Sequence, residues 1–204
     1  MRTRELAVTG AFEFAPRSYP DQRGVFVSPF QEDAFVAATG HPLFPVAQAS
    51  ASESHRGVLR GLHYTPAPPG TAKYVHCPRG RALDIVVDLR LGSPTFGARD
   101  TVELDPGSFR AVYLPPGVGH AFVALEDHTV VAYLLSQRYV AANELALDAM
   151  DPELDLPLPP DLDFTRSARD QAAPTAAAAR AAGLLPTYER CLEVQRGFHV
   201  PRSR

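Results

Sequence analysis

The sequence predicts an all-β protein, a sandwich or a barrel, followed by a short C-terminal helical segment. Short β-branched or alternating runs recur at close spacing up to about residue 140, and glycine and proline punctuate the chain between them. Long helical periodicity is absent before residue 170. Many short strands separated by turns are typical of sandwiches and barrels.

The most regular strands lie between residues 82 and 135. We expect strands at 82–89, 101–104, 110–114, 121–125 and 129–135. Proline and glycine turns follow the first three, such as Asp105-Pro106-Gly107 and Pro115-Pro116-Gly117. Two shorter runs, 62–64 and 73–75, precede this series and are candidates for neighbouring strands.

The C-terminal third differs in composition. Residues 151–163 are rich in Pro, Asp and Leu, which predicts either an ordered wrapping segment or a loop. The run 174–182 is nearly all alanine, with Pro174 near its start and Gly183 at its stop, and it predicts a helix. We expect one domain over residues 1–204, with its β core at about 20–150 and the wrapping segment and helix at about 151–190.

The composition indicates a soluble globular protein and argues against two classes of partner. The chain has 204 residues, of which 45% are hydrophobic and 21% charged, and its net charge is −3. This charge leaves no basic footprint for nucleic acid. No apolar run approaches the ~20 residues of a bilayer span, and residues 1–20 lack the apolar stretch of a signal peptide, so we expect a cytoplasmic protein without membrane contact. Cys77 and Cys191 stand far apart and are expected to be free thiols.

Lys73 is the only lysine among 20 basic residues. Among so many arginines, a retained lysine suggests a site that needs a compact point charge, although one lysine can also survive by chance. His63 lies shortly before it. If 62–64 and 73–75 are neighbouring strands, an imidazole that takes a proton near neutrality and an ammonium that stabilises negative charge share one face. The pair then suits proton abstraction next to a carbonyl; the alternative is a surface histidine beside a solvated lysine.

A second histidine follows a glycine-rich turn. Pro115-Pro116-Gly117-Val118-Gly119-His120 delivers His120 to the start of a strand. This run resembles the second motif of the cupins, in which the histidine faces the inside of a β-barrel. Many cupins bind a metal there through a His-x-His pair, but Tyr64 and Thr65 follow His63, so the second histidine is missing and we predict no metal site.

Tyr133 occupies a strongly apolar predicted strand, and Tyr139 follows it. A tyrosine in such a strand can simply belong to the core. Alternatively, its phenol can act as a general acid. The pattern alone leaves both interpretations open.

Several ordered motifs together resemble one family over most of the chain, from residue 21 to 152 and more weakly to about 185. The dTDP-4-dehydrorhamnose 3,5-epimerase family acts on dTDP-4-keto-6-deoxyhexoses, and the resemblance implies a cupin-type jelly roll without metal or organic cofactor. It also implies a homodimer that exchanges N-terminal strands. The matching motifs are Asp21-Gln22-Arg23-Gly24, Val58-Leu59-Arg60-Gly61-Leu62-His63-Tyr64, Lys73, Asp88-Leu89-Arg90, Ser93-Pro94-Thr95-Phe96-Gly97, Pro116-Gly117-Val118-Gly119-His120 and Asp151-Pro152.

The resemblance also implies roles for single residues. His63 matches the base that removes the proton beside the C4 ketone, and Asp170 the carboxylate that orients this histidine. Lys73 matches the cation that polarises the C4 oxygen, and Tyr133 the acid on the opposite face. The positions that match substrate or nucleotide binding are Arg60, Gln48, His120 and Tyr139, together with Arg23 and Phe26 of the partner-reaching segment, and Ser50, where the family commonly has Asn.

The predicted function is therefore an epimerase that inverts C5 and/or C3 of a dTDP-4-keto-6-deoxyhexose through an enolate. Departures such as Ser50, and the absence of Trp from the chain, resemble the antibiotic-sugar branch of the family, in which members can invert only one centre. The alternatives are a cupin 3,4-ketoisomerase acting on the same sugar and a non-catalytic sugar-nucleotide-binding cupin. A metal-dependent cupin oxygenase is a more distant alternative.

Overall fold

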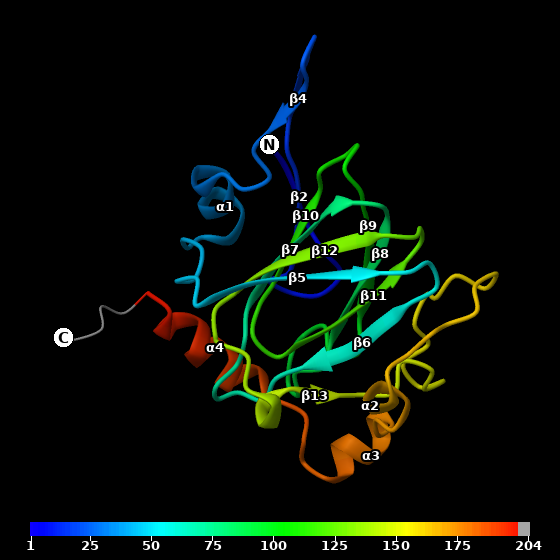
Figure 1. Cartoon of the computed structure of the whole chain (residues 1–204). Coiled ribbons are helices and arrows are strands. Elements are labelled where there is room, and N and C mark those ends of the chain that lie inside the picture. Colours follow the sequence, from blue (N-terminus) through cyan, green and yellow to red (C-terminus); the bar gives the residue numbers. More distant parts are fainter. Residues whose placement is uncertain (200–204) are drawn as a thin grey trace.

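Two β-sheets face each other in the body of the molecule (Figure 1). The computed structural model describes residues 1–199. The six-stranded sheet has the order β1 (Arg2–Glu5), β2 (Phe12–Ala15), β10 (Ala111–Leu114), β7 (Lys73–Arg79), β12 (Thr129–Leu135) and β5 (Gln48–Ser54). The five-stranded sheet has the order β13 (Leu145–Ala146), β6 (Leu59–Tyr64), β11 (Val118–Ala124), β8 (Ala82–Asp88) and β9 (Arg99–Leu104).

The predicted all-β fold is confirmed, and it is a cupin-type jelly roll. Each of the five strands expected between residues 82 and 135 is present, although β11 begins at Val118, three residues earlier than predicted. All strand pairs within the two sheets are antiparallel. Apolar side chains from both sheets, among them Val75, Val86 and Phe122, form the core between them.

The sequence patterns did not predict some of the strands and helices. The six-stranded sheet also includes β1 and β2, which lie before the expected core at 20–150, and β5, which has alanines and polar side chains but no large apolar residue. β1 is exposed along its whole length, so it shows no apolar alternation. Two helices, α1 (Glu32–Thr39) and α4 (Tyr188–Gly197), each bury a single residue, Phe35 and Cys191, which leaves a weak helical pattern.

The C-terminal segment wraps the outer face of the five-stranded sheet, as one of the two interpretations of residues 151–163 proposed. Its leucines, including Leu154 and Leu162, pack against the side chains of that face. The alanine-rich helix is confirmed as α3 (Ala176–Ala181), which starts two residues after Pro174 and is capped by the Thr175 side chain. Short turns of helix also form at η1 (Ala141–Asn143) and α2 (Ala168–Gln171).

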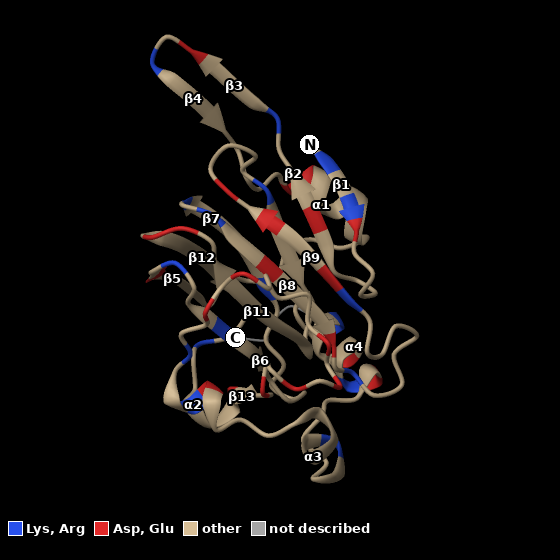
Figure 2. Cartoon of the chain, turned by 90° about the vertical axis from the view of Figure 1, so that its right-hand side faces the viewer, with Lys and Arg blue, Asp and Glu red and all other residues tan. Residues whose placement is uncertain are grey.

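Aromatic side chains cover the outer face of the six-stranded sheet, where Phe35 of α1 packs on Phe14 and Tyr113. Next to this face, the hairpin β3 (Ser18–Asp21) and β4 (Gly24–Val27) extends away from the body of the molecule (Figure 2). Among residues 1–199, no helix combines the length and apolar character that crossing a membrane requires.

A β-bulge at Gly61 sets the direction of two site residues on β6. The register with β11 pairs Arg60 with Phe122 and His63 with His120, and it shifts between them. Residues three apart normally face opposite sides of a sheet, but the bulge turns both Arg60 and His63 towards the interior. Gly61 has φ +116°, and an added Cβ would lie 2.6 Å from the His120 carbonyl oxygen.

We expect Gly61→Ala to destabilise the fold by at least the roughly 1–3 kcal/mol that such a backbone conformation costs other residues. The added methyl must also displace the β11 backbone. Urea denaturation measures the loss of unfolding free energy. Gly197→Ala is the matched control, because an added Cβ there meets nothing within 4 Å; equal stability of both variants would show that the bulge tolerates a side chain.

Candidate active site

A histidine–aspartate pair forms where the C-terminal segment meets the five-stranded sheet. His63 Nε2 lies 2.7 Å from Asp170 Oδ1, and the His63 side chain is 27% exposed whereas Asp170 is buried. Asp170 lies in the first turn of α2, and its backbone N–H donates to the side chain of the N-cap residue Ser167. The helix cap therefore holds the carboxylate that orients the imidazole.

The surroundings of Asp170 keep it ionised. Burial raises the pKa of Asp170, but hydrogen bonds with His63, with Ser167 and from the Gly61 backbone N–H lower it by more, so the pKa lies below its usual value. An ionised carboxylate stabilises a protonated imidazole. The pair is thus suited to a histidine that accepts a proton.

The depressed pKa of Asp170 makes its contribution to folding stability dependent on pH. A carboxyl group with a lowered folded-state pKa stabilises the native state above its unfolded pKa, near 3.8, and the contribution disappears as pH falls through the folded value. We expect the melting temperatures of wild type and Asp170→Asn to converge as pH is lowered from about 6 to about 3. Calorimetry across this range checks it, with the exposed Asp161→Asn as control; a constant gap for Asp170→Asn would contradict it.

A second such pair lies beside the first. His120 Nε2 is 2.6 Å from Asp84 Oδ2, and both residues are buried. His120 is the direct cross-strand partner of His63, so the two imidazoles project from neighbouring strands of one wall. The other carboxylate oxygen, Asp84 Oδ1, has no hydrogen-bond partner among residues 1–199.

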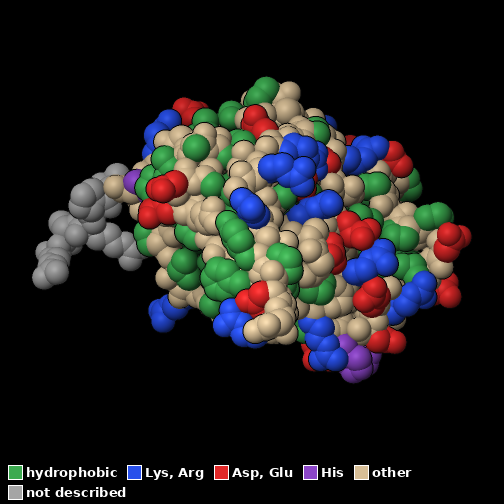
Figure 3. All heavy atoms as spheres, turned by 90° about the horizontal axis from the view of Figure 1, so that it is seen from above, with side chains coloured by type: hydrophobic (Ala, Val, Ile, Leu, Met, Phe, Trp, Pro, Cys, Tyr) green, Lys and Arg blue, Asp and Glu red, His purple; other side chains and the backbone are tan. Residues whose placement is uncertain are grey.

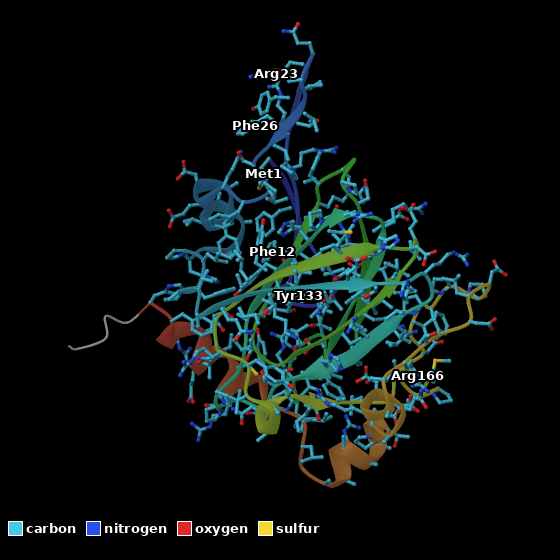
Figure 4. The ribbon with its side chains drawn as sticks, in the orientation of Figure 1. Met1, Phe12, Arg23, Phe26, Tyr133 and Arg166 are labelled. Atoms are coloured by element: carbon cyan, nitrogen blue, oxygen red, sulfur yellow. The ribbon has the colours of Figure 1, made fainter. Side chains whose placement is uncertain are left out.

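The opposite wall carries Tyr133 and Lys73. These residues come from β12 and β7, neighbouring strands in which Tyr133 pairs with Val75 and Leu135 with Lys73. The ring of Tyr133 meets that of His120 edge-on, with centroids 6.2 Å apart. Figure 4 shows Tyr133 in the middle of the molecule. The histidines and the tyrosine–lysine pair therefore approach one space from two sheets.

The premise that 62–64 and 73–75 are neighbouring strands is wrong. β6 and β7 belong to different sheets. His63 and Lys73 nonetheless both face the interior, because each lies on the inner face of its own sheet. The chain between them contains Pro66, Pro68 and Pro69 and crosses from one sheet to the other rather than making a hairpin.

Lys73 is half-buried, and its ammonium makes no hydrogen bond or ion pair within residues 1–199. Burial lowers the pKa of Lys73, while the negative charges of Glu144 and Asp84 oppose this shift. Tyr133 is also half-buried, and burial raises the pKa of its phenol. The site thus offers an amine without a partner among residues 1–199, suited when protonated to bind an anionic oxygen, and a phenol that retains its proton at neutral pH.

Three expected binding residues gather at one end of β5. Gln48 Nε2 donates to Ser50 Oγ at 2.8 Å, and Gln48 Oε1 accepts from the Tyr139 backbone N–H at 2.9 Å. Ser50 is the cross-strand partner of Tyr133. At the other end of β5, Arg60 Nε donates to Ser54 Oγ at 3.1 Å.

Arg23 and Phe26 lie apart from these residues. Both belong to the protruding hairpin, where Arg23 pairs with Asp21 and Phe26 is 69% exposed. Figure 4 places them far from Tyr133 of the same chain. The chain's own fold therefore does not bring them into the site formed by His63, Lys73 and Tyr133.

The structure adds residues that the sequence patterns did not single out. Arg166 and Arg169 line a cavity of about 430 Å³ together with Arg60, His63 and Asp170. Arg166 also bonds Asp148, and Arg169 the Glu144 carbonyl oxygen. The sequence offers one signal for them, because both arginines lie within four residues before Asp170. No spacing rule, however, predicts that they contact residues about a hundred positions earlier. Within residues 1–199, no three His, Cys, Asp or Glu side chains form a group suited to a metal ion.

Comparison with known proteins shows the family of this chain. Residues 5–178 match the family described as dTDP-4-dehydrorhamnose 3,5-epimerase. The chain belongs to this family. It is 47% identical over 203 residues to a dTDP-4-dehydrorhamnose 3-epimerase of Streptomyces niveus, covering 100% of this chain and 97% of the relative. Family membership makes the protein an epimerase of the isomerase class that acts on dTDP-sugars.

Two solved structures of epimerases share the fold closely. A 4-keto-6-deoxy sugar epimerase from the novobiocin biosynthetic gene cluster of Streptomyces spheroides is 48% identical with a TM-score of 0.89, over 94% of this chain and 95% of that one. A 3'-monoepimerase from Streptomyces bikiniensis, solved with dTDP, is 44% identical with a TM-score of 0.89, over 95% and 96% of the two chains. The latter is a double variant in which a histidine and a tyrosine are replaced, and these are separated along their chain by the same interval as His63 and Tyr133.

Proposed function

We propose that this protein inverts C3 of a dTDP-4-keto-6-deoxyhexose through an enolate, in the biosynthesis of an antibiotic deoxysugar. C3 is the centre shared by the family's 3,5-epimerases and by the 3-epimerase relatives of Streptomyces. The relative from a novobiocin cluster supports the antibiotic setting. C5, which also flanks the ketone, is the second centre that the same chemistry can reach.

The observation that supports the proposal is an imidazole and a phenol on opposite walls. His63, paired with Asp170, faces the interior from the five-stranded sheet, and Tyr133 faces it from the six-stranded sheet. Inversion needs a proton removed from one face of the carbon and delivered to the other. Lys73, beside Tyr133, supplies a charge for the enolate oxygen at C4.

The test is proton NMR in deuterated water with dTDP-4-keto-6-deoxyglucose. We expect deuterium at C3 and an inverted C3 centre, while a signal at C5 reports whether the second centre also exchanges. A ketone that moves from C4 to C3 would instead establish a ketoisomerase. Absence of any turnover would favour a sugar-nucleotide-binding cupin.

The hairpin β3–β4 is proposed to act on the site of a second subunit in a homodimer that exchanges N-terminal strands. Its apolar side chains Tyr19, Val25 and Phe26 are 50%, 50% and 69% exposed, and Arg23 lies at its tip. On the face seen from above, hydrophobic side chains reach the surface between basic ones (Figure 3). Such an exposed apolar projection is typical of a segment that binds another protein surface.

Mixed dimers test this arrangement. Arg23→Ala is expected to raise KM, and His63→Ala to remove activity. If the hairpin acts on the partner's site, mixing the two variants restores one complete site per mixed dimer, with wild-type KM. No recovery on mixing, or a monomer by light scattering, would contradict the exchange.

A further inference from the structure

The inner face of β5 carries a row of serines at the site. Gln48, Ser50, Ser52 and Ser54 alternate with Ala49, Ala51 and Glu53, which are exposed on the outer face. Each inner serine meets a site residue: Ser50 accepts from Gln48, Ser54 from Arg60, and Ser52 Oγ lies 3.4 Å from the Tyr133 hydroxyl. Ser50 and Ser54 thus contact expected binding residues, and Ser52, which lies between them, contacts Tyr133.

Ser52 is the one hydrogen-bond partner of the Tyr133 hydroxyl among residues 1–199. The Tyr133 ring packs against the apolar core, and its edge contact with His120 involves the rings alone. Ser52 itself is only half-buried. Its hydroxyl therefore links the half-buried phenol to β5, the edge strand of the sheet. The distance is long for a hydroxyl pair, as catalytic contacts often are before substrate binds.

The proposed function creates a need for such a contact. If His63 removes a proton and Tyr133 delivers another to the opposite face, each inversion ends with a protonated His63 and a Tyr133 phenolate. The enzyme cannot repeat the reaction in the same direction until His63 loses a proton and Tyr133 regains one. A phenolate packed against apolar side chains is costly to keep, and Ser52 is its one hydrogen-bond partner within residues 1–199.

Resting on that proposed function, we propose that Ser52 is the positioning residue through which Tyr133 recovers its proton after each inversion. The Ser52 hydroxyl donates its proton to the phenolate oxygen while a water molecule donates one to Ser52 Oγ. The hydroxide that remains accepts the proton of His63. The net change is a proton moved from His63 to Tyr133, which returns both to their starting states.

The experiment compares deuterium exchange with inversion in Ser52→Ala. Exchange with retention needs only His63, which loses the substrate proton to solvent and returns a deuteron to the same face. We expect this exchange to persist, while kcat for inversion falls about 10²-fold with KM little changed. Ser52→Thr, which keeps a hydroxyl on Cβ, should restore inversion. Ser54→Ala is the matched variant, and it should raise KM through Arg60 while keeping kcat.

Inversion by Ser52→Ala at the wild-type rate would overturn the proposal. It would also be overturned if Ser52→Thr did not restore inversion while both variants had the melting temperature of the wild type. Exchange and inversion lost together in Ser52→Ala would also overturn it, because a general structural role moves both. The proposed function fails on a separate result: exchange that survives in His63→Ala.

Discussion

Replacing His63 with alanine is expected to abolish solvent deuterium incorporation and to lower kcat about 10²- to 10⁴-fold, the range that a positioned general base contributes. The expectation rests on the 2.7 Å contact with Asp170 and on the ionised state of that carboxylate. Two other imidazoles of residues 1–199 lie 2.6 Å from a carboxylate oxygen, but His120 is buried against Asp84, and His128 pairs with Glu53 on the exposed face of β5. Mass spectrometry of the recovered sugar in deuterated water gives the measurement.

His55→Ala is the control for this variant. His55 lies in the turn between β5 and β6, and its side chain is 84% exposed. The His55→Ala variant should keep full deuterium exchange and turnover. Exchange that continues in His63→Ala at the rate of the His55 control would assign the base to another residue.

Replacing Lys73 with arginine should retain the charge yet lower kcat about 10²- to 10³-fold, the usual effect of removing one donor to a developing oxyanion. Lys73 is half-buried between Tyr133 and the acidic groups Asp84 and Glu144, with its ammonium unpaired among residues 1–199. A planar guanidinium is wider and directs its donors in a fixed fork, so it cannot take the place of a point charge there.

Two further variants separate shape from charge. Lys73→Met keeps the length of the stem without the charge and should be at least as inactive as Lys73→Arg. Arg79→Lys, at the exposed other end of β7, is the matched control and should be neutral. Burial lowers the pKa of Lys73 from its ordinary value of 10.5. As pH rises, the side chain therefore loses its charge before pH 10.5, and wild-type activity should decline with it. Near-normal turnover of Lys73→Arg would remove the lysine from the mechanism.

The sequence predicted the parts of the fold that strong local patterns encode. Strands such as 129–135 and the alanine helix carry dense β-branched or helical signals, and both formed. β1 and β5 were missed because their side chains are exposed or small, so only pairing with neighbours makes them strands. Tertiary pairing of this kind leaves little trace in a local window.

The candidate site was also predicted only in part. The motifs around His63 and His120 identified the residues but not the sheet to which each belongs. The strand of Lys73 was assumed to lie beside that of His63, but the two strands belong to different sheets. Asp84 and Ser52 lie in ordinary strand patterns. Only the pairing of β8 with β11 and of β5 with β12 brings them within reach of His120 and Tyr133. Their roles depend on contacts between neighbouring strands of one sheet, which spacing along the chain does not record.

The helix that carries Asp170 has a consequence for how the enzyme is made. Every strand of the two sheets precedes residue 170 in the chain, so the barrel can assemble around an imidazole that still lacks its carboxylate. We expect a nascent or truncated chain that ends before α2 to be folded yet catalytically silent. During refolding, activity should then appear after the barrel has formed, as the wrapping segment docks and α2 closes on His63. Docking of the C-terminal segment thus completes the histidine–aspartate pair.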